Sequence, residues 1–255
     1  MPDALPKPVF SVITVVYNGA AVLERTLQSV VSQQYSRLEY LVIDGGSTDG
    51  TLELLERYRD RIDVLVSESD RGLYDAMNKG IDRASGDFIW FLNAGDEFTT
   101  PDTVARLAEA WQGEDVLYGE TIMLDESGQE AGFRDYKRLP RALNWYSFRE
   151  GMVVCHQSLV VSRRIAQRYN LDYPISADID WAIRSLKRTE DSRIRRVDFP
   201  LSRYLRGGLS ARRRRQAWRD RLRISLKHYG WVQTLVFHLI MAFKYLWRRL
   251  NNRPE

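Results

Sequence analysis

The stretch over residues 67–98 contains the polar side chains best suited to chemistry. It reads SESDRGLYDAMNKGIDRASGDFIWFLNAGDEF and predicts a polar loop, a short helix and an apolar strand at 88–92, followed by Asn93 and Asp96. A buried strand fixes the oxygens that follow it at the rim of a sheet, where carboxylate and amide groups can hold a metal ion and a sugar nucleotide. We expect Asp96 to be a metal ligand and Asn93 to contact the metal or the ribose. The alternative is an Asp that only caps a helix or a turn.

Earlier strand–helix units must position this stretch. Residues 9–16 and 38–43 are nearly all apolar, as in strands buried on both faces, and each is followed by a turn and a helical pattern. Strands that alternate with helices favour a parallel sheet with right-handed crossovers. The loops at Asn18, Asp44 and Asp70 would then meet at one edge of the sheet, where open α/β folds bind ligands.

The strand–helix alternation weakens after a helix that begins near Pro101. The expected fold is α/β, with a mixed, mostly parallel sheet flanked by helices. The later patterns predict a hairpin from 116–123 and 132–136, a strand at 155–161, a helix at 177–186 and a strand at 194–199.

Length and composition limit the class of protein. The 255 residues can form one large domain, and 44% hydrophobic residues are typical of a globular fold. The single cysteine, Cys155, excludes a disulfide framework within the chain and a clustered Cys/His metal site. The start, MPDALPKPVF, has neither the basic end nor the apolar core of a signal peptide. We therefore expect a cytoplasmic location.

The net charge of +4 hides an uneven distribution. From residue 200 onward, 14 Lys and Arg face two acids, Asp220 and Glu255, so this part carries +12 and the rest about −8. Residues 231–250 are strongly apolar but include Gln, His and Lys, so they fall short of a membrane span. This pattern predicts a pair of basic amphipathic helices on an anionic membrane surface. The alternative is a C-terminal helix packed on the domain.

Two other classes are disfavoured by the sequence. Nucleic-acid binding fits the isoelectric point of about 9.2, but the positive charge is confined to the tail and no basic and aromatic residues alternate as in RNA-binding sheets. We expect no nucleic-acid partner. A dinucleotide-dependent dehydrogenase is excluded because no GxGxxG follows the first strand.

Five motifs occur in order over residues 9–210: VITVVYNGA, VIDGGSTDGT, ESDRGLYDAMNKGI, GDFIWFLNAGD and SADIDW. Together they resemble family 2 glycosyltransferases with the GT-A fold, and within them the colanic-acid-type polysaccharide transferases. The resemblance implies a GT-A domain at 1–210, with a donor half at about 1–110 and an acceptor half at about 111–210, then a tail at 211–255. It implies inverting sugar transfer from a nucleotide-diphosphate sugar to a lipid-linked glycan at the inner membrane face.

The resemblance also assigns roles to residues. Asp178 of SADIDW is the expected base for the acceptor hydroxyl, whereas Asp180, two residues further along a helix, would point away from it. The alternative for both residues is an exposed acid on a helix surface. The expected nucleotide and donor contacts are Tyr17, Asn18, Asp44, Asp75, Asn78, Asn93 and Arg206, and the expected acceptor or sugar contacts are His156 and Gln157.

Two motifs depart from the family pattern. The usual LDxDD is LNAGD here, with Asn93 and Gly95 in place of acids, so the implied Mn²⁺ or Mg²⁺ would rely on Asp96. The second Asp of a VDDGS-type loop is Gly45, and Asp44 is expected to take its place at the base. These departures keep open a catalytically weak or silent relative that binds nucleotide sugars or acts as a scaffold.

Overall fold

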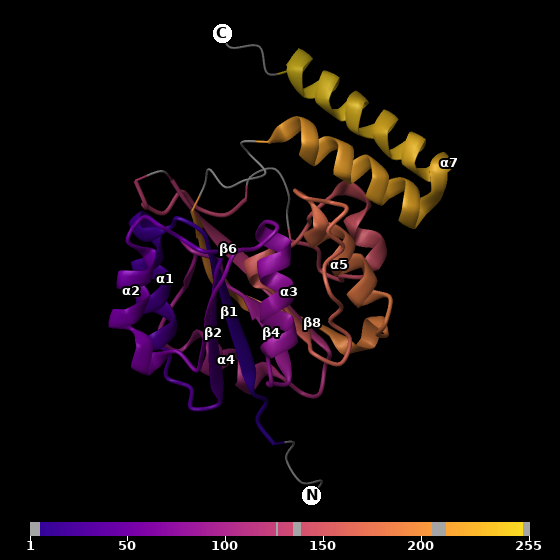
Figure 1. The fold of residues 1–255 in the computed structure, drawn as a ribbon. Helices are drawn as coiled ribbons and strands as arrows, with labels where there is room; N and C mark the ends of the chain where they lie inside the picture. The colour runs from indigo at the N-terminus through magenta and orange to yellow at the C-terminus, as the bar shows by residue number, and fades with distance from the viewer. Residues whose placement is uncertain (1–5, 126, 135–138, 206–212, 252–255) are drawn as a thin grey trace, which may run out of the picture.

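One mixed sheet forms the centre of the protein (Figure 1). The computed structural model describes residues 6–125, 127–134, 139–205 and 213–251, with side chains to residue 240. Within these ranges eight strands pair in the order β3-β2-β1-β4-β7-β6-β8-β5. The strands are β1 (Phe10–Val16), β2 (Leu38–Asp44), β3 (Val64–Ser67), β4 (Phe88–Phe91), β5 (Glu97–Phe98), β6 (Val116–Leu124), β7 (Leu159–Ser162) and β8 (Ile194–Leu205).

Helices cover both faces of the sheet, and the side chains of β1 alternate between them. Val12 and Val16 pack in the core under the helices α1, α2 and α4, whereas Ile13 and Val15 pack in the core under α3 and α5. All four side chains are buried, as predicted for a strand covered on both faces. The helices are α1 (Ala20–Val31), α2 (Thr51–Arg57), α3 (Leu73–Arg83), α4 (Thr103–Ala110), α5 (Ala177–Leu186) and α7 (Arg214–Asn251), with 3₁₀ turns η1 (Arg59–Arg61), η2 (Trp145–Glu150), η3 (His156–Ser158) and η4 (Asp191–Arg193).

The first four strands of the sheet are parallel, and their carboxyl ends meet at one edge. Val16 of β1 pairs with Asp44 of β2, which in turn pairs with Ser67 of β3. On the other side of β1, β4 runs in the same direction. The loops after these strands therefore converge, as the sequence predicted.

The second half of the sheet differs from the sequence prediction. The expected hairpin is reduced to a short antiparallel return: Leu124 forms a single bridge with Glu130, and the Met123 N–H donates to the Gly132 carbonyl at 2.7 Å. Residues 132–134 form no strand, and 135 and 136 lie outside the described residues. The long partner of this part of β6 is β8, whereas β7 pairs only with Val116–Tyr118. The strand expected from Cys155 begins only at Leu159, because residues 156–158 form the turn η3.

The C-terminal helix α7 consists of two segments joined at Gly230, whose φ is 77°. The first segment packs on α5 and η2, with Ile224 buried in the core. The second segment turns back alongside the first (Figure 1), where Ser225 and Thr234 are linked by a hydroxyl hydrogen bond of 3.0 Å. The expected pair of helices is confirmed, and the first segment also packs on the domain. The boundary at residue 210 lies outside the described residues.

Within the part of the chain that the structure describes, no helix is both long and apolar enough to cross a membrane.

Candidate active site

The turn after β4 carries the expected metal ligand, Asp96. The Asp96 N–H donates to the Asn93 carbonyl at 2.9 Å, and the Gly95 N–H donates to Thr26 Oγ1 at 2.9 Å. Gly95 has a φ of 97°, a left-handed conformation that glycine adopts readily and that an L-residue adopts only under strain. The backbone of this turn therefore explains why the acid that the family usually has at position 95 is missing here.

The Asp96 side chain is only 4% exposed. Gln157 donates to its Oδ2 at 2.7 Å. Burial raises the pKa of this carboxyl to about 7, against the opposing effect of the Gln157 amide and of the backbone of Leu205 and Asn93. Asp96 is thus a carboxyl that holds its proton until near neutral pH, and a bound cation would favour its ionised form.

The oxygens at this turn suit a hard divalent cation. The Asn93 Oδ1 is buried and finds no hydrogen-bond partner among the described residues, an arrangement that costs about 1–3 kcal/mol. An amide oxygen and a carboxylate are ligands that Mg²⁺ and Mn²⁺ accept. No group of three or more His, Cys, Asp or Glu that could hold a metal occurs among the described residues. Asn93 and Asp96 are the two side chains at this turn that could hold such a cation.

The loop after β2 places Asp44 inside the protein. Its fully buried carboxylate accepts hydrogen bonds from the Gly46 N–H at 3.1 Å and the Ser67 hydroxyl at 2.7 Å, and also from Ser47. These contacts hold the shape of the loop. Both carboxylate oxygens of Asp44, a residue expected to contact the nucleotide base, therefore accept hydrogen bonds from donors within the protein.

A different carboxylate reaches the position next to Gly45. A Cβ added to Gly45 would overlap Asp70 Oδ2 and would lie 3.4 Å from the Tyr17 ring. The Tyr17 side chain is 66% exposed, so its ring is open to a ligand. The sequence pattern predicts Asp70 at the rim of the sheet but not its contact with the loop after β2, because that contact joins two loops that are distant in the sequence.

Asn18 and Asp49 tie the first two loops together. Asn18, with a φ of 47°, accepts from the Thr48 N–H at 2.9 Å and donates its own N–H to Ser47 Oγ at 2.7 Å. Asp49 accepts from the N–H groups of Ala20 and Thr51, both at 3.1 Å, at the starts of α1 and α2. One carboxylate thus serves two helix N-termini.

The two expected donor contacts on α3 have partners within the protein. Asn78 is clamped to the backbone of Tyr169, accepting from its N–H at 2.6 Å and donating to its carbonyl at 3.1 Å. Asp75 accepts from the backbone and side chain of Arg71, which lowers its pKa despite partial burial. Asn78 therefore fixes the loop around Tyr169.

Residues His156 and Gln157 occupy the turn η3 and face inward. Gln157 binds Asp96, as described above. His156 Nε2 lies 2.6 Å from the Tyr169 hydroxyl, and its ring stacks on Phe91 with centroids 5.1 Å apart. Burial lowers the pKa of His156 to about 4, so the imidazole is neutral at physiological pH. The structure gives His156 a packing role at this site.

Asp178 lies in the first turn of α5 and is half-buried. Its Oδ1 accepts from the Ile179 N–H at 3.0 Å and from the Tyr74 hydroxyl at 3.3 Å. Burial raises the pKa of this carboxyl, against the opposing effect of the Ile179 N–H, the Arg221 charge and the Tyr74 hydroxyl. A carboxylate with a raised pKa is a stronger base toward a hydroxyl, as general-base catalysis requires.

A wall of aromatic side chains connects the two acids. Tyr74, which binds Asp178, stacks on Tyr169 with ring centroids 5.2 Å apart. The Tyr169 hydroxyl is hydrogen-bonded to His156, and the next residue, Gln157, binds Asp96. Tyr74 and Tyr169 are not among the site residues expected from the sequence. Tyr74 had a signal, because it belongs to the YDAMNKGI motif, whereas Tyr169 had none.

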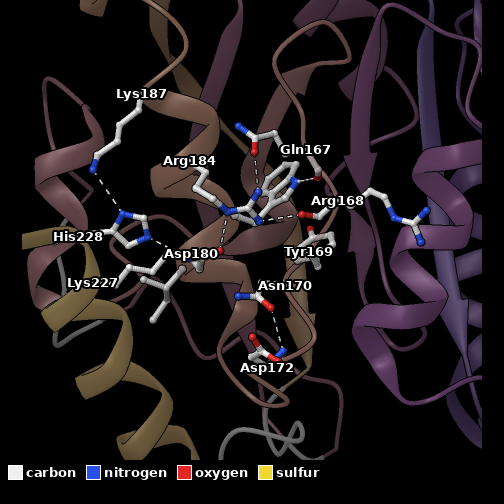
Figure 2. Close-up of polar contacts among 12 residues, drawn as sticks. Gln167, Arg168, Tyr169, Asn170, Asp172, Asp180, Arg184, Lys187, Lys227 and His228 are labelled. Carbon is white, nitrogen blue, oxygen red and sulfur yellow. Dashed lines mark hydrogen bonds and ion pairs between the residues drawn. The ribbon is translucent and has the colours of Figure 1, made fainter.

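Asp180 points away from Asp178, which confirms the prediction from helix geometry. Its fully buried carboxylate binds Arg184 at 2.6 Å, His228 at 2.8 Å and Lys227 at 3.1 Å (Figure 2). These partners hold its pKa well below the usual range despite burial. Asp180 therefore joins α5 to α7. The expected donor contact Arg206 lies outside the described residues.

Acids and loops gathered at the carboxyl edge of an open α/β sheet are typical of nucleotide-binding α/β proteins. Residues 11–169 match the family model "Glycosyl transferase family 2". The chain belongs to family 2 of the glycosyltransferases.

Two curated relatives show what the chain is similar to. It is 36% identical over 187 residues, 69% of each chain, to a PGL/p-HBAD biosynthesis glycosyltransferase of Mycobacterium tuberculosis. It is 38% identical over 95 residues to the putative teichuronic acid biosynthesis glycosyltransferase TuaG of Bacillus subtilis, covering 36% of this chain and 38% of that one.

Solved structures share the fold. The S. aureus TarS 1–349 complex with UDP aligns with a TM-score of 0.65 at 19% identity, covering 86% of this chain and 65% of that one. The mannosyltransferase PcManGT of Pyrobaculum calidifontis, in complex with GDP-Man and Mn²⁺, aligns with a TM-score of 0.63 at 19% identity. The alignment covers 89% of this chain and 66% of that one. The mixed sheet flanked by helices is thus the GT-A fold that the sequence predicted.

Proposed function

We propose that the protein is an inverting glycosyltransferase that moves a sugar from a nucleotide-diphosphate sugar to a hydroxyl of a lipid-linked glycan in cell-surface polysaccharide or glycolipid synthesis. The observation that carries the proposal is Asp178, a half-buried carboxyl with a raised pKa at a helix N-terminus. Support for the donor class comes from neighbours solved with UDP and with GDP-Man. Support for the acceptor class comes from relatives named for glycolipid and teichuronic acid synthesis.

The donor is held by the loops at the carboxyl edge. The exposed Tyr17 ring stacks on the base, and the Asp70 carboxylate beside it accepts an N–H of the base. Asn93 and Asp96 would hold a divalent cation, Mn²⁺ or Mg²⁺, and the bound cation would supply positive charge to stabilise the leaving diphosphate. Asp96 is kept in place by Gln157.

The acceptor hydroxyl gives its proton to Asp178. The oxygen of the acceptor hydroxyl attacks the anomeric carbon on the face opposite the diphosphate. A new C–O bond forms, and the bond from the anomeric carbon to the phosphate oxygen breaks. The nucleoside diphosphate leaves, the configuration at the anomeric carbon inverts, and Asp178 passes its proton to water. Tyr74 and the Ile179 N–H hold the carboxylate oriented during this step.

The second segment of α7 binds an anionic membrane surface at the cytoplasmic face. Its apolar side chains recur at helical spacing on one exposed side, while Thr234 on another side is buried against the first segment. The exposed arginines Arg214 and Arg215 at the start of the first segment, and Arg213 just before it, add attraction to anionic lipid. The exposed apolar residues are Trp231, Val232, Leu235, Val236, Leu239 and Ile240.

The activity is tested with a panel of nucleotide sugars and Mn²⁺. We expect hydrolysis or transfer from at least one donor, and loss of transfer with retained donor binding in Asp178→Asn. A second candidate, binding without turnover, is favoured by the absence of a three-ligand metal cluster among the described residues. A donor that binds wild-type protein without any turnover would support that candidate and refute the transferase.

The membrane contact is tested by vesicle sedimentation with phosphatidylglycerol–phosphatidylcholine and with phosphatidylcholine alone. We expect binding to the anionic vesicles, lost in Leu235→Glu/Leu239→Glu and retained in the control Leu52→Glu, which changes an exposed leucine of α2. A dimer in solution that the double variant dissociates would show instead that a second copy covers this face.

A further inference from the structure

The first segment of α7 reaches the chain just before α5. The Asp220 Oδ2 accepts from the backbone N–H groups of Ile175 at 2.8 Å and Ser176 at 3.2 Å. The Asp220 side chain is fully buried, and its Oδ1 accepts from Gln216 at 2.8 Å. A buried carboxylate is stable when donors surround it, and two of these three donors come from another element.

Asp220 holds the backbone that leads into α5, because it accepts from the N–H groups of the N-cap residue Ser176 and of Ile175 before it. Ser176 is the N-cap residue of α5, and its own side chain makes no capping hydrogen bond. Instead its hydroxyl lies 3.4 Å from the Ala217 carbonyl of α7. The N–H groups at and before the helix start are therefore satisfied from α7, and the start of α5 is fixed from outside.

Ile175 is held from two sides. Asp220 of α7 binds its N–H, and the Tyr74 hydroxyl of α3 donates to its carbonyl at 3.0 Å. Tyr74 also contacts Asp178, and the charge of Arg221, the residue after Asp220, acts on the same carboxyl. The base thus lies between α3 of the donor half and α7 of the tail.

We propose that Asp220 is a positioning residue for the acceptor base Asp178, which makes α7 part of the active site. This inference rests on the proposed function, in which Asp178 accepts the proton of the acceptor hydroxyl. Asp220 touches no substrate. It sets the position of the backbone at 175–176 and, through the first turn of α5, the direction of the Asp178 carboxylate.

The test compares Asp220→Ala with Asp220→Asn in the full-length protein. Alanine leaves the N–H groups of Ile175 and Ser176 without this acceptor. The side-chain oxygen of asparagine can still accept both hydrogen bonds, and the Gln216 amide can turn so that its oxygen accepts from the new NH₂ group. We expect kcat to fall about 10–100-fold in Asp220→Ala, since small misplacements of a catalytic group have effects of this size. The donor KM stays unchanged, and Asp220→Asn restores most of kcat.

The pH profile separates positioning from general loss of stability. The groups that face Asp178 are Tyr74 from α3, the Ile179 N–H of its own helix and Arg221 from α7. In Asp220→Ala we expect the acid limb of the kcat profile to move to lower pH, because water reaches the loosened carboxylate. The control His228→Gln loosens the same helix at its contact with Asp180 and leaves the profile unchanged.

The outcomes distinguish this inference from the proposed function. If Asp178→Asn keeps full transfer, the assignment of the base fails, and the inference fails with it. If Asp178→Asn is inactive but Asp220→Ala lowers only the melting temperature, with kcat per folded molecule and pH profile intact, the inference alone is overturned. If Asp220→Ala does not fold, a wild-type kcat and profile in Asp220→Leu or Asp220→Ser at low temperature would overturn it.

Discussion

The Asp70 carboxylate fills the space that a side chain at position 45 would need. A Cβ on Gly45 would overlap Asp70 Oδ2. The backbone at Gly45 is not left-handed, unlike that of its neighbour Gly46, so glycine is required at position 45 by space and not by φ. Asp70, in the loop after β3, thus places a carboxylate beside the position where the family pattern leads us to expect an acid.

Exchange of these two positions is expected to preserve nucleotide binding. Asp70→Ala should weaken binding of the preferred nucleotide, UDP or GDP, about tenfold or more, because hydrogen bonds to charged groups contribute about 1.5–3 kcal/mol. Gly45→Asp should also weaken binding, since two carboxylates would crowd one place. The double variant Gly45→Asp/Asp70→Ala should recover most of the affinity in calorimetric titrations. Asp60→Ala, which removes an exposed acid of η1, is the control, and a double variant as weak as Asp70→Ala would contradict the exchange.

Cation binding is expected to depend on pH with a midpoint near 7. Because burial raises the pKa of Asp96 to about 7, a cation must displace a proton at lower pH. The apparent affinity for Mn²⁺ in the presence of nucleotide should therefore fall about tenfold per pH unit below 7 and be level above it. Calorimetry at pH 6, 7 and 8 measures this dependence, and equal affinities at the three values would exclude Asp96 as the proton-coupled ligand.

Asp96→Asn is expected to stabilise the metal-free protein. The pKa of Asp96 is raised in the folded state, so its contribution to stability is fully present below pH about 4 and is lost as the pH rises through about 7. Asparagine does not ionise, so the protein avoids this loss of stability at high pH, and its side-chain oxygen can still accept the hydrogen bond from the Gln157 amide. The melting temperature should rise at pH 8 and much less at pH 4, while nucleotide-dependent Mn²⁺ binding disappears. A lower melting temperature at pH 8 would contradict the raised pKa.

Removal of the Asp180 carboxylate should be strongly destabilising. Asp180→Ala removes the carboxylate shared by the buried His228, the mostly buried Arg184 and the half-exposed Lys227. Breaking a buried ion pair typically costs about 3–5 kcal/mol. Chemical denaturation measures the loss. The control Asp82→Ala removes a half-exposed acid that pairs with Arg168, and it should cost less than about 1 kcal/mol. Equal costs would show that the Asp180 cluster does not anchor α7.

Local sequence patterns predicted the parts of the site that depend on local geometry. The place of Asp96 follows from an apolar strand that ends in a turn, and the direction of Asp180 away from Asp178 follows from the helical period. The sheet-edge convergence of Asn18, Asp44 and Asp70 follows from strand–helix alternation. These features need only a few neighbouring residues.

Contacts between distant segments could not be predicted in this way. Gln157 binds Asp96 across 61 residues, and Asp220 binds Ile175 across 45. The pairing of β6 is similar, because β6 pairs along most of its length with β8, a strand that lies far away in the sequence. Neither the hydrophobic periodicity nor the composition of such a segment indicates which distant segment it contacts.

A pair of substitutions tests why this chain lacks the acids usual in its family. Asn93→Asp converts a buried, unpaired Oδ1 into a second carboxylate and should tighten Mn²⁺ binding about tenfold at pH 8, since added charge strengthens such sites.

The gain from Asn93→Asp should shrink at pH 6, because a like charge raises the pKa of Asp96 further. Gly95→Asp should behave differently, because a φ of 97° costs a non-glycine residue about 1–3 kcal/mol. Its Cβ would face Leu205 and Val22 at 3.5 and 3.6 Å, so it should lower the melting temperature without tightening Mn²⁺. Tighter Mn²⁺ binding in Gly95→Asp would mean that the turn can relax, and that space for a third ligand is present after all.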